Sequence, residues 1–317
     1  MGTPAGGLAA KTLLAALAAL AVLVLAVAAA AGLSGQRSYL DLLNAQIAKK
    51  ARFSRFYAGV PGRPPTRELI AELGDLEDDF PAVQAEALSV LAQHLAALER
   101  GEAGAPRMDK TYNQLFAPGG ARRGLAGAAA RLEMGAARLV YGDQVDLFTR
   151  IGGEGWRVFN LVLFHREVPG NAQRCPALMR HLRRIPGLQS AMLSILTPGT
   201  RIPPHRDPNK GVIRYHLAFK VPRDRENCFI EVGGERYSWA EGAGVVFDDA
   251  YVHRVENSTD EHRVILFADL LRPLHGSARA LQRLANAALQ VHPGVRRLVR
   301  ASRVEKEGGP GAGGPGA

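Results

Sequence analysis

The sequence predicts a mainly β domain with flanking α-helices, preceded by one N-terminal transmembrane helix. The run from Leu13 to Leu33 is apolar and carries no charge, which is typical of a membrane span. After Asp146 the chain contains segments such as Trp156 to Phe164 that alternate or run continuously apolar, as strands do. Phe80 to Leu98 and His275 to His292 instead carry apolar residues at helical spacing.

The composition is that of a globular chain with a basic surface. Its 317 residues are 47% hydrophobic and 22% charged, which is enough material for a buried core. The formal net charge of +10 indicates an acidic partner. No zinc-finger spacing or aromatic–basic RNA signature accompanies this charge, so we expect no nucleic-acid partner and favour an anionic membrane. The two cysteines, Cys175 and Cys228, do not form a disulfide framework.

The N-terminal apolar run has two interpretations. At about 1.5 Å per residue, Leu13 to Leu33 can span a hydrocarbon core of roughly 30 Å. The alternative is a cleaved signal peptide, since Ala26 to Ala28 and the alanines after them offer cleavage sites. The run is longer than the usual apolar region of a signal peptide, so we expect a retained single-pass anchor. More Lys and Arg follow the run than precede it, which places the main domain on the cytoplasmic side.

Composition shifts divide the chain into five segments. Gln36 to Lys50 predicts an amphipathic helix, and Gly59 to Pro65 is rich in proline and glycine, as linkers are. Residues 101–124 remain unassigned, and Leu125 to Val140 is alanine-rich and expected to be helical. The predicted segments are an anchor (1–34), a juxtamembrane helix and linker (35–75), the main domain (76–275), a basic C-terminal helix (276–304) and a disordered tail (305–317).

One short motif predicts a metal site. His205 and Asp207 form a His-x-Asp pair, and His253 follows later in the chain. Two imidazoles and one carboxylate form the facial triad that holds Fe(II) and leaves positions open for a co-substrate and O2. The cysteines lie too far apart in the sequence for a zinc–thiolate site.

The strand expected from Ile213 to Phe219 carries two basic side chains on one face. Alternation places Arg214 and His216 on that face and the large apolar side chains on the other. If the first face points inward, two unpaired cations would be buried unless an anion lies there, and the carboxylate of a metal-bound keto acid would suit them. The other interpretation is a solvent-exposed face.

A second basic group is expected beside the triad. His253 is expected to close one strand and Arg263 to open the next, so that a hairpin brings them together. Arg263 could then bind the distal carboxylate of 2-oxoglutarate through two hydrogen bonds. Ser194, which we place inward on the strand from Ser190 to Thr197, could add a hydroxyl hydrogen bond to the same carboxylate.

Other prominent residues are given structural roles. Trp239 and Phe247 are expected in the core. The neighbouring Asp248 and Asp249 are expected to cap the turn before His253. We expect His94 to be a packed or surface residue, not a ligand, and His262 and His275 to be exposed.

The motifs around these residues resemble a known family. The run from Ser190 to Pro273 resembles the catalytic domain of the aspartyl/asparaginyl β-hydroxylases, which are Fe(II)/2-oxoglutarate dioxygenases. Its HRDP, RYHL, YSW, VVFDD, VENST and ILFADLLRPL motifs are most similar to the bacterial lipid A acyl-chain hydroxylases. The resemblance implies a double-stranded β-helix, the jelly roll of cupins, with helices packed against one sheet.

By position, the resemblance also implies roles for the site residues. His205, Asp207 and His253 would be the iron ligands. The distal carboxylate of 2-oxoglutarate would be held by Arg263 and Ser194, and the carboxylate nearer the metal would meet the remaining pair, Arg214 and His216.

Three functions remain open. Asp207 favours an acyl-lipid hydroxylase, because vertebrate peptide hydroxylases of the family have glycine there. The Ser-Ile-x-x-Pro-Gly-Thr run around Ser194 instead resembles the peptide hydroxylases, and Gly101 to Val140 matches neither branch. A third hypothesis is a jelly-roll binding module without catalysis. We expect an enzyme that acts on a lipid or, alternatively, a peptide.

Overall fold

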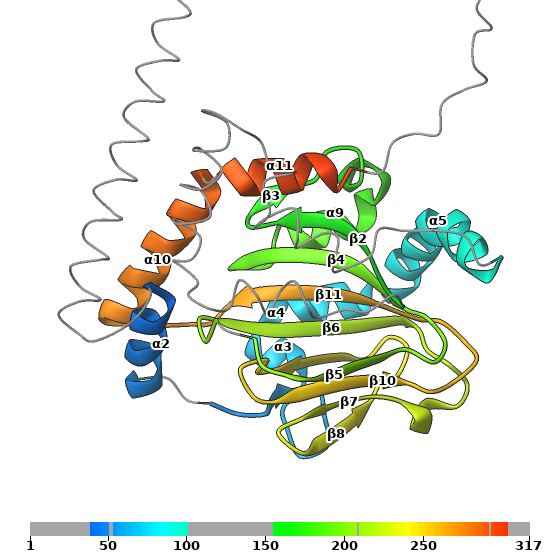
Figure 1. Ribbon diagram of the computed structural model, residues 1–317, viewed down its shortest axis with the longest axis horizontal. Helices are drawn as coiled ribbons and strands as arrows, with labels where there is room; N and C mark the ends of the chain where they lie inside the picture. Colours follow the sequence, from blue (N-terminus) through cyan, green and yellow to red (C-terminus); the bar gives the residue numbers. More distant parts are fainter. Residues whose placement is uncertain (1–38, 51–52, 101–154, 208, 292, 304–317) are drawn as a thin grey trace, which may run out of the picture.

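The computed structural model describes residues 39–50, 53–100, 155–207, 209–291 and 293–303 (Figure 1). Two antiparallel sheets form the body of this part. The larger sheet has the strand order β1 (Phe56–Ala58), β9 (Gly244–Phe247), β6 (Val212–Lys220), β11 (Arg263–Leu271), β4 (Leu188–Leu196), β2 (Trp156–Leu163) and β3 (Arg166–Glu167). The smaller sheet has the order β5 (Arg201–His205), β10 (His253–Asn257), β7 (Cys228–Val232) and β8 (Glu235–Ser238).

Helices accompany the larger sheet. In chain order the described helices are α2 (Tyr39–Lys50), α3 (Thr66–Leu69), α4 (Ala71–Asp78), α5 (Phe80–Glu99), α9 (Pro176–Leu182), α10 (Gly276–Val291) and α11 (Pro293–Ala301). Short 3-10 turns lie at Ala172–Arg174 and Arg225–Asn227. A mainly β, antiparallel architecture with flanking helices is thereby confirmed.

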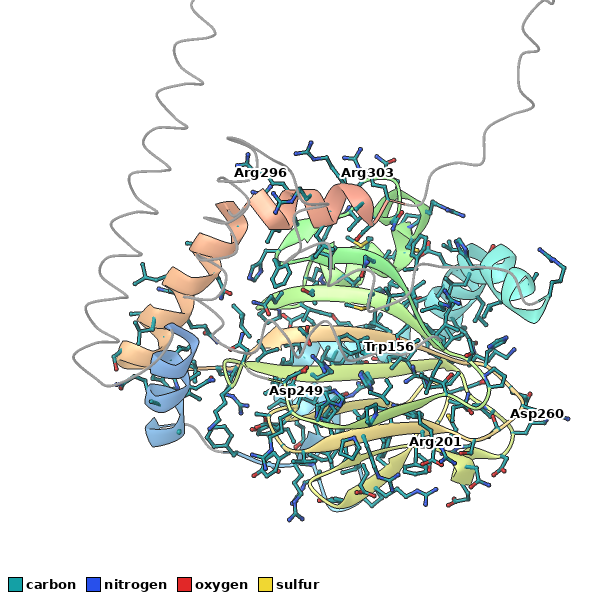
Figure 2. The ribbon with its side chains drawn as sticks, in the orientation of Figure 1. Trp156, Arg201, Asp249, Asp260, Arg296 and Arg303 are labelled. Atoms are coloured by element: carbon teal, nitrogen blue, oxygen red, sulfur yellow. The ribbon has the colours of Figure 1, made fainter. Side chains whose placement is uncertain are left out.

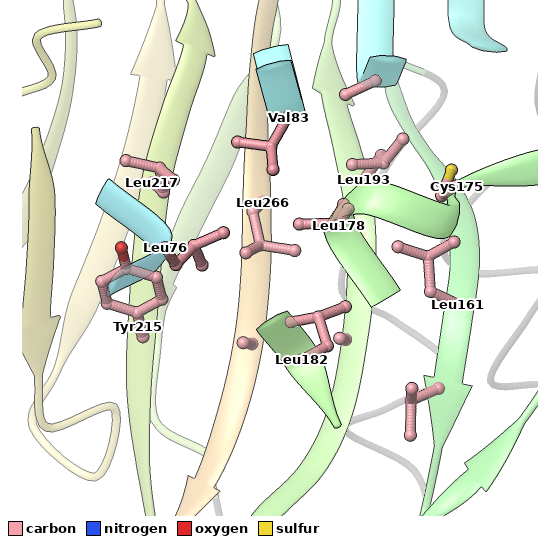
Figure 3. Packing of buried hydrophobic residues seen from close by; sticks show 14 of the residues in the cluster. Leu76, Val83, Leu161, Cys175, Leu178, Leu182, Leu193, Tyr215, Leu217 and Leu266 are labelled. Carbon is pink, nitrogen blue, oxygen red and sulfur yellow. The ribbon is translucent and has the colours of Figure 1, made fainter. Parts of the chain in front are cut away.

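The two faces of the larger sheet bury different layers. On the outer face, Leu76 of α4, Val83 of α5 and Leu178 of α9 pack against strand side chains such as Leu266 of β11 (Figure 3). Each buried leucine of this kind stabilises the fold by about 2 kcal/mol, as an upper estimate. The inner face packs against the smaller sheet through a second apolar cluster that includes Trp239 and other aromatic side chains.

Strand β6 shows how the sequence produces these layers. Its large apolar residues, Ile213, Tyr215, Leu217 and Phe219, all belong to the helix-side layer. Arg214 and His216 therefore point between the sheets, and both are buried. The predicted alternation is confirmed, and the interpretation of a solvent-exposed face is wrong.

A carboxylate from α5 fixes α9 in place. Glu86 accepts hydrogen bonds from the backbone N–H groups of Ala177 (2.8 Å) and Leu178 (2.9 Å). These groups lie in the first turn of α9, where N–H donors have no partner within the helix. His181 of α9 also contacts Asp79 at 2.8 Å. Polar contacts thus hold α9 in the orientation that buries its leucines.

The C-terminal helix α10 presents its polar residues inward. Gln282 donates to the carbonyl of Gly211 (2.6 Å), and Asn286 accepts from Gln189 (3.0 Å). Leu284, one of the apolar residues at helical spacing in this segment, is 49% exposed. The surface beneath α10 instead offers backbone and amide groups to the polar residues. The predicted N-terminal helix is confirmed as α2, which packs against α10.

Among the predictions about chain organisation, the hairpin is wrong, and the terminal segments lie outside the residues that the structure describes. His253 opens β10 in the smaller sheet, and Arg263 opens β11 in the larger one, so no hairpin joins them and that prediction is wrong. Within the described ranges, no helix has the length and apolar character to cross a membrane. The predicted anchor (1–34), the helix expected at 125–140 and the tail (305–317) all lie outside those ranges.

Candidate metal centre

Strand pairing brings the predicted metal ligands together. In the register of β5 and β10, His205 lies directly opposite His253, and their ring centroids are 4.1 Å apart. Asp207 follows β5, and its backbone N–H donates to the carbonyl of Asp249 (2.9 Å). Potential ligand atoms of the three side chains lie within 4.8 Å of one another. The His-x-Asp spacing and one antiparallel register thus assemble the site.

Backbone carbonyls orient both imidazoles. His205 Nδ1 lies 2.8 Å from the carbonyl of Pro203, and His253 Nδ1 lies 3.0 Å from that of Tyr251. A carbonyl only accepts, so each Nδ1 carries the proton and each Nε2 keeps its lone pair for a metal. Burial lowers the pKa of His253 to about 4, so its ring is neutral near pH 7.

Arg214 lies at the centre of a buried cluster of carboxylates. Its Nη2 atom lies 2.6 Å from Asp207 and 2.9 Å from Asp249, and its Nε donates to Asp269 at 2.9 Å. The guanidinium also stacks over the ring of Phe267, 4.1 Å from its centroid. The expectation that Arg214 lacks partners without a bound anion is therefore wrong.

The same cluster shifts the carboxyl groups in opposite directions. Burial alone would raise the pKa of Asp207, but the charges of Arg214, His253 and His205 outweigh it and lower the pKa to about 2. Burial raises the pKa of Asp249 well above its ordinary value and also raises that of Asp269. Asp207 is thus the carboxylate that is held ionised, as a metal ligand must be.

A pocket extends from the triad into the space between the sheets. It encloses about 340 Å³, counting the part open to solvent. Its lining consists of Trp156, Ser194, Ile202, His205, Arg214, His216, Ile230, Phe247, His253, Val255, Arg263 and Phe267. The predicted site residues from five different strands therefore border one space, with Asp207 beside its histidines.

A buried cation without a counter-ion borders this pocket. Arg263 is 2% exposed, and among the described residues it forms no ion pair. Its Nη2 donates to Ser194 Oγ (3.2 Å), and its guanidinium lies 4.8 Å from the centroid of the Trp239 ring. Burial lowers its pKa to about 10, so it stays charged near pH 7. Because a buried unpaired charge is costly, this end of the pocket fits an anionic ligand.

Ser194 is prepared to donate to the same ligand. Its Oγ atom accepts from the indole N–H of Trp156 (2.9 Å) as well as from Arg263. A serine hydroxyl has two acceptor lone pairs and one O–H donor. With both lone pairs engaged, the remaining O–H is free to donate to an acceptor such as a carboxylate.

His216 has no hydrogen-bond partner in the part of the chain that the structure describes. Both of its ring nitrogens are buried, and the ring packs against Phe247 and Phe267 with centroids 4.9 and 5.2 Å away. Burial first, and then the nearby cations, lower its pKa well below the ordinary value, so the ring is neutral. A neutral imidazole can donate one hydrogen bond to a ligand in the pocket.

The residues present fit a divalent cation at the triad. Two imidazole nitrogens and a carboxylate match the facial set of non-haem iron sites. In addition, Asp207 is held ionised by Arg214 and the two histidines, so it offers a negatively charged oxygen ligand. The donor set therefore suits a 2+ ion.

The structure corrects some of the other predicted residue positions and confirms the rest. His262, expected to be exposed, is 8% exposed and buried. Asp248 caps the turn by accepting from the backbone N–H of Ala250 (3.1 Å), whereas Asp249 pairs with Arg214 instead. Trp239 and Phe247 are confirmed as core residues, and the ring of His94 packs near Phe159.

Sequence reasoning missed three residues of the site. Trp156 was read only as part of a strand, Asp249 only as a turn residue, and Asp269 was given no role. Asp269 contacts Arg214 across 55 positions of sequence, so no local spacing could indicate it. For Asp249, the neighbouring Asp-Asp pair was visible, but which of the two turns inward depends on the folded chain.

The surroundings of the site are similar to known proteins. Residues 77–273 match the family described as Aspartyl/Asparaginyl beta-hydroxylase. An ornithine lipid ester-linked acyl 2-hydroxylase from Rhizobium tropici is 41% identical over 124 residues, which cover 39% of this chain and 44% of that protein. Aspartate beta-hydroxylase domain-containing protein 2 from Xenopus tropicalis is 39% identical over 127 residues, covering 37% and 34%. The chain thus spans less than half the length of these relatives.

The similarity to solved structures is weaker than the similarity in sequence. A cupin domain of an XRE family transcriptional regulator from Enterobacter cloacae overlaps 38% of this chain and 99% of that domain, with a TM-score of 0.26 and 15% identity. The fold described above therefore rests on the strand order of the two sheets and not on this overlap.

Proposed function

The chain belongs to the aspartyl/asparaginyl beta-hydroxylase family, and from that premise we propose that it is an Fe(II)/2-oxoglutarate-dependent dioxygenase that hydroxylates an unactivated C–H bond of a lipid acyl chain. The observation that carries this proposal is the pairing of two features in one pocket. A His–Asp–His set lies at the rim, and the interior is bordered by the buried guanidinium of Arg263, which forms no ion pair with any described residue. Such a pocket suits a metal together with a carboxylate ligand.

Each site residue has a distinct task in this proposal. When bound, Fe(II) with 2-oxoglutarate and O2 supplies the oxidising chemistry for C–H hydroxylation. His205, Asp207 and His253 would hold the iron. Arg263 and Ser194 would hold the outer carboxylate of 2-oxoglutarate, since both present N–H or O–H donors there.

His216 completes the proposed co-substrate site. Its two buried nitrogens have no hydrogen-bond partner among the residues that the structure describes, so it would donate to the inner carboxylate without first giving up another hydrogen bond. The surrounding rings of Phe247, Phe267 and Trp239 exclude water from this contact. Exclusion of water strengthens the electrostatic interactions that position the keto acid.

The acyl-lipid substrate is supported by similarity and by Asp207. The Rhizobium tropici relative is named for hydroxylation of an ester-linked acyl chain. The triad also opens toward solvent: His205 and Asp207 are partly exposed, and Pro203, Pro204 and Arg206 beside them are exposed. A substrate larger than the pocket could reach the metal from this side. The similarity to aspartate beta-hydroxylase domain-containing proteins keeps a peptide or protein substrate as the second candidate.

We further propose a membrane location with the dioxygenase domain on the cytoplasmic side. The apolar run from Leu13 to Leu33 would be the anchor, and α2 follows it after a few residues. α2 packs against α10, which contacts α11. The exposed arginines of this region would then face anionic headgroups; they are Arg296 and Arg303, both labelled in Figure 2, and Arg300.

The experiment that tests the function is succinate release from 2-oxoglutarate by the full chain in detergent. It is run with Fe(II), with and without lipid extract, beside Asp207→Ala. Lipid-stimulated turnover that is lost in the variant is the expected result. Turnover stimulated by an Asp- or Asn-containing peptide and never by lipid would show that the substrate is a peptide or protein and not an acyl lipid. No iron binding and no turnover would leave a jelly-roll binding module.

A further inference from the structure

We propose that Asn44 of α2 and Gln282 of α10 are positioning residues for the metal ligand Asp207, acting through the backbone of residues 209–211. The proposal rests on the metal centre of the proposed function and extends it to two helices. Both residues lie outside the pocket lining. The hydrogen bonds of the segment between Asp207 and β6 carry the proposal.

Asp207 lies in the connection between two strands. β5 ends at His205, and β6 begins at Val212. On the β5 side, the backbone N–H of Asp207 donates to the carbonyl of Asp249 (2.9 Å). On the β6 side, strand pairing does not reach the ligand. The position of the backbone that carries this carboxylate therefore depends on how residues 209–211 are held against the rigid elements around them.

Asn44 holds this segment from α2. Its Oδ1 atom accepts a hydrogen bond from the backbone N–H of Lys210 at 2.9 Å. Leu43 and Ile47, on either side of Asn44 in the helix, are both buried. Because they fix α2 against the rest of the protein, the acceptor has a defined position.

Gln282 holds the next residue from α10. Its buried Nε2 atom donates to the carbonyl of Gly211 at 2.6 Å. A Cβ atom at Gly211 would lie 2.9 Å from Oδ1 of Asn209, 3.3 Å from this Nε2 atom and 3.6 Å from Cδ1 of Ile47 in α2. Only glycine allows so close an approach. The segment is thus fitted tightly against α2 and α10, which lie side by side (Figure 1).

Arg272 holds the same segment from the end of β11. Its backbone N–H donates to the carbonyl of Gly211 (2.8 Å), and its Nε donates to the carbonyl of Lys210 (2.7 Å). Arg272 also pairs with buried Asp248, so its replacement would disturb more than this segment. Asn44 and Gln282 are therefore the positions at which the role of the segment can be tested by itself.

These contacts link the metal centre to the N-terminal part of the chain. α2 is the first described helix after the apolar run of Leu13 to Leu33. If α2 moved away from α10, the N–H of Lys210 would lose its acceptor, and the backbone that carries Asp207 would be less fixed. Metal affinity depends on such support, because ligand atoms must be held in the geometry that the ion requires.

The test measures Mn(II) affinity of the full chain in detergent, from the EPR signal of the free ion. Asn44→Ala removes the acceptor, and Gln282→Met removes the donor at nearly constant size. Direct partners of a metal ligand contribute about 10–100-fold to affinity, and these residues act one step further away, so we expect losses of about threefold to tenfold. The EPR lines of bound Mn(II) should also broaden, since a less fixed Asp207 gives a range of ligand geometries.

Two further variants separate positioning from general packing. Asn286→Leu removes another buried amide of α10, whose partner is Gln189 of β4. It should lower stability in urea unfolding and leave Mn(II) affinity unchanged. Asn44→Asp keeps an acceptor for the N–H of Lys210, so it should regain the affinity and the narrow lines that Asn44→Ala loses.

Unchanged Mn(II) affinity in both Asn44→Ala and Gln282→Met would overturn the proposal, and so would an equal loss in Asn286→Leu. A loss in only one of the first two variants would overturn the role of the other residue. Asn44 is only partly buried, so its variants decide the question if Gln282→Met does not fold.

The wild-type protein distinguishes this proposal from the proposed function. Binding of Mn(II) without succinate release from 2-oxoglutarate and Fe(II) would refute the proposed function alone, and the Mn(II) titrations would still judge Asn44 and Gln282. Wild-type protein that binds no Mn(II) would refute both.

Discussion

His205 and His253 face each other directly across the antiparallel pair β5 and β10, with ring centroids 4.1 Å apart. The register of two strands therefore defines the metal centre. A slip of one residue would turn one histidine to the opposite face of the sheet. β10 is held on both sides, by β5 and β7, which fixes this register.

We predict that His253→Ala strongly weakens metal binding at the triad. Loss of one of three protein ligands should weaken Mn(II) affinity by at least about 100-fold, more than loss of an outer-shell partner would. His275→Ala, a change in an exposed histidine, should leave the affinity unchanged. Mn(II) titration by EPR measures both. Equal affinities in the two variants would show that the metal binds elsewhere.

Two buried arginines should respond in opposite ways to replacement by methionine. Arg263→Met removes a buried cation that has no carboxylate partner among the described residues, so the ligand-free protein should keep or gain stability. Its KM for 2-oxoglutarate should rise by about 100-fold or more, because the outer carboxylate loses a charged partner. Urea unfolding and succinate release measure the two effects.

Arg272→Met is the comparison for this prediction. Arg272 contacts buried Asp248 at 2.7 Å, so its removal leaves a carboxylate uncompensated in the interior. The free energy of unfolding should fall by about 3–5 kcal/mol. A similar loss of stability in Arg263→Met would mean that Arg263 has a structural role and would weaken the proposed keto-acid site.

A buried carboxyl on the helix side predicts a pH-dependent stability. Burial raises the pKa of Glu77 above its ordinary value of 4.5, so ionised Glu77 costs stability in the folded state. This cost is absent below pH 4.5 and grows as the pH rises through the folded pKa. Glu77→Gln removes the ionisation, and its amide oxygen can still accept from Thr66 and Tyr215.

The stability of Glu77→Gln relative to wild type, measured as the difference in the free energy of unfolding, should therefore be greater at pH 7 than at pH 4. Urea unfolding at the two pH values measures the difference. A difference that is the same at both values would show that hydrogen-bond geometry, and not charge, controls the effect.

The basic surface of α11 should couple turnover to anionic lipid. Replacement of Arg296, Arg300 and Arg303 by glutamine should raise, by several-fold, the concentration of phosphatidylglycerol vesicles that gives half-maximal stimulation. Stimulation by the wild type should weaken as salt is added, because the attraction is screened. Vesicles of phosphatidylcholine should show little difference between the proteins.

An equal change of charge elsewhere controls for net charge. The exposed arginines at and after α9 lie on the helix side of the larger sheet, paired with acidic residues; they are Arg180, Arg183 and Arg184. Their replacement by glutamine should leave the vesicle dependence close to wild type. If both triple variants respond alike, the effect reflects total charge, and α11 is not the contact surface.

The sequence by itself determined the local features of this protein. Alternation identified β6 and its two faces, and helical spacing identified α5 and α10, because these periods follow from backbone geometry alone. The His-x-Asp pair and His253 were recognisable because metal ligands need particular donor atoms. Arg263 and Ser194 were chosen for their hydrogen-bonding chemistry, and the structure places both at the pocket.

Only the tertiary structure decided how these features meet. The chain crosses between sheets after β10, so His253 and Arg263 approach from opposite sheets and not through a hairpin. Gln282 of α10 turns inward because a backbone carbonyl lies beneath it. The partners of Arg214 come from β11 and from the loops that follow β5 and β9. Such contacts depend on packing between distant segments, which no local pattern records.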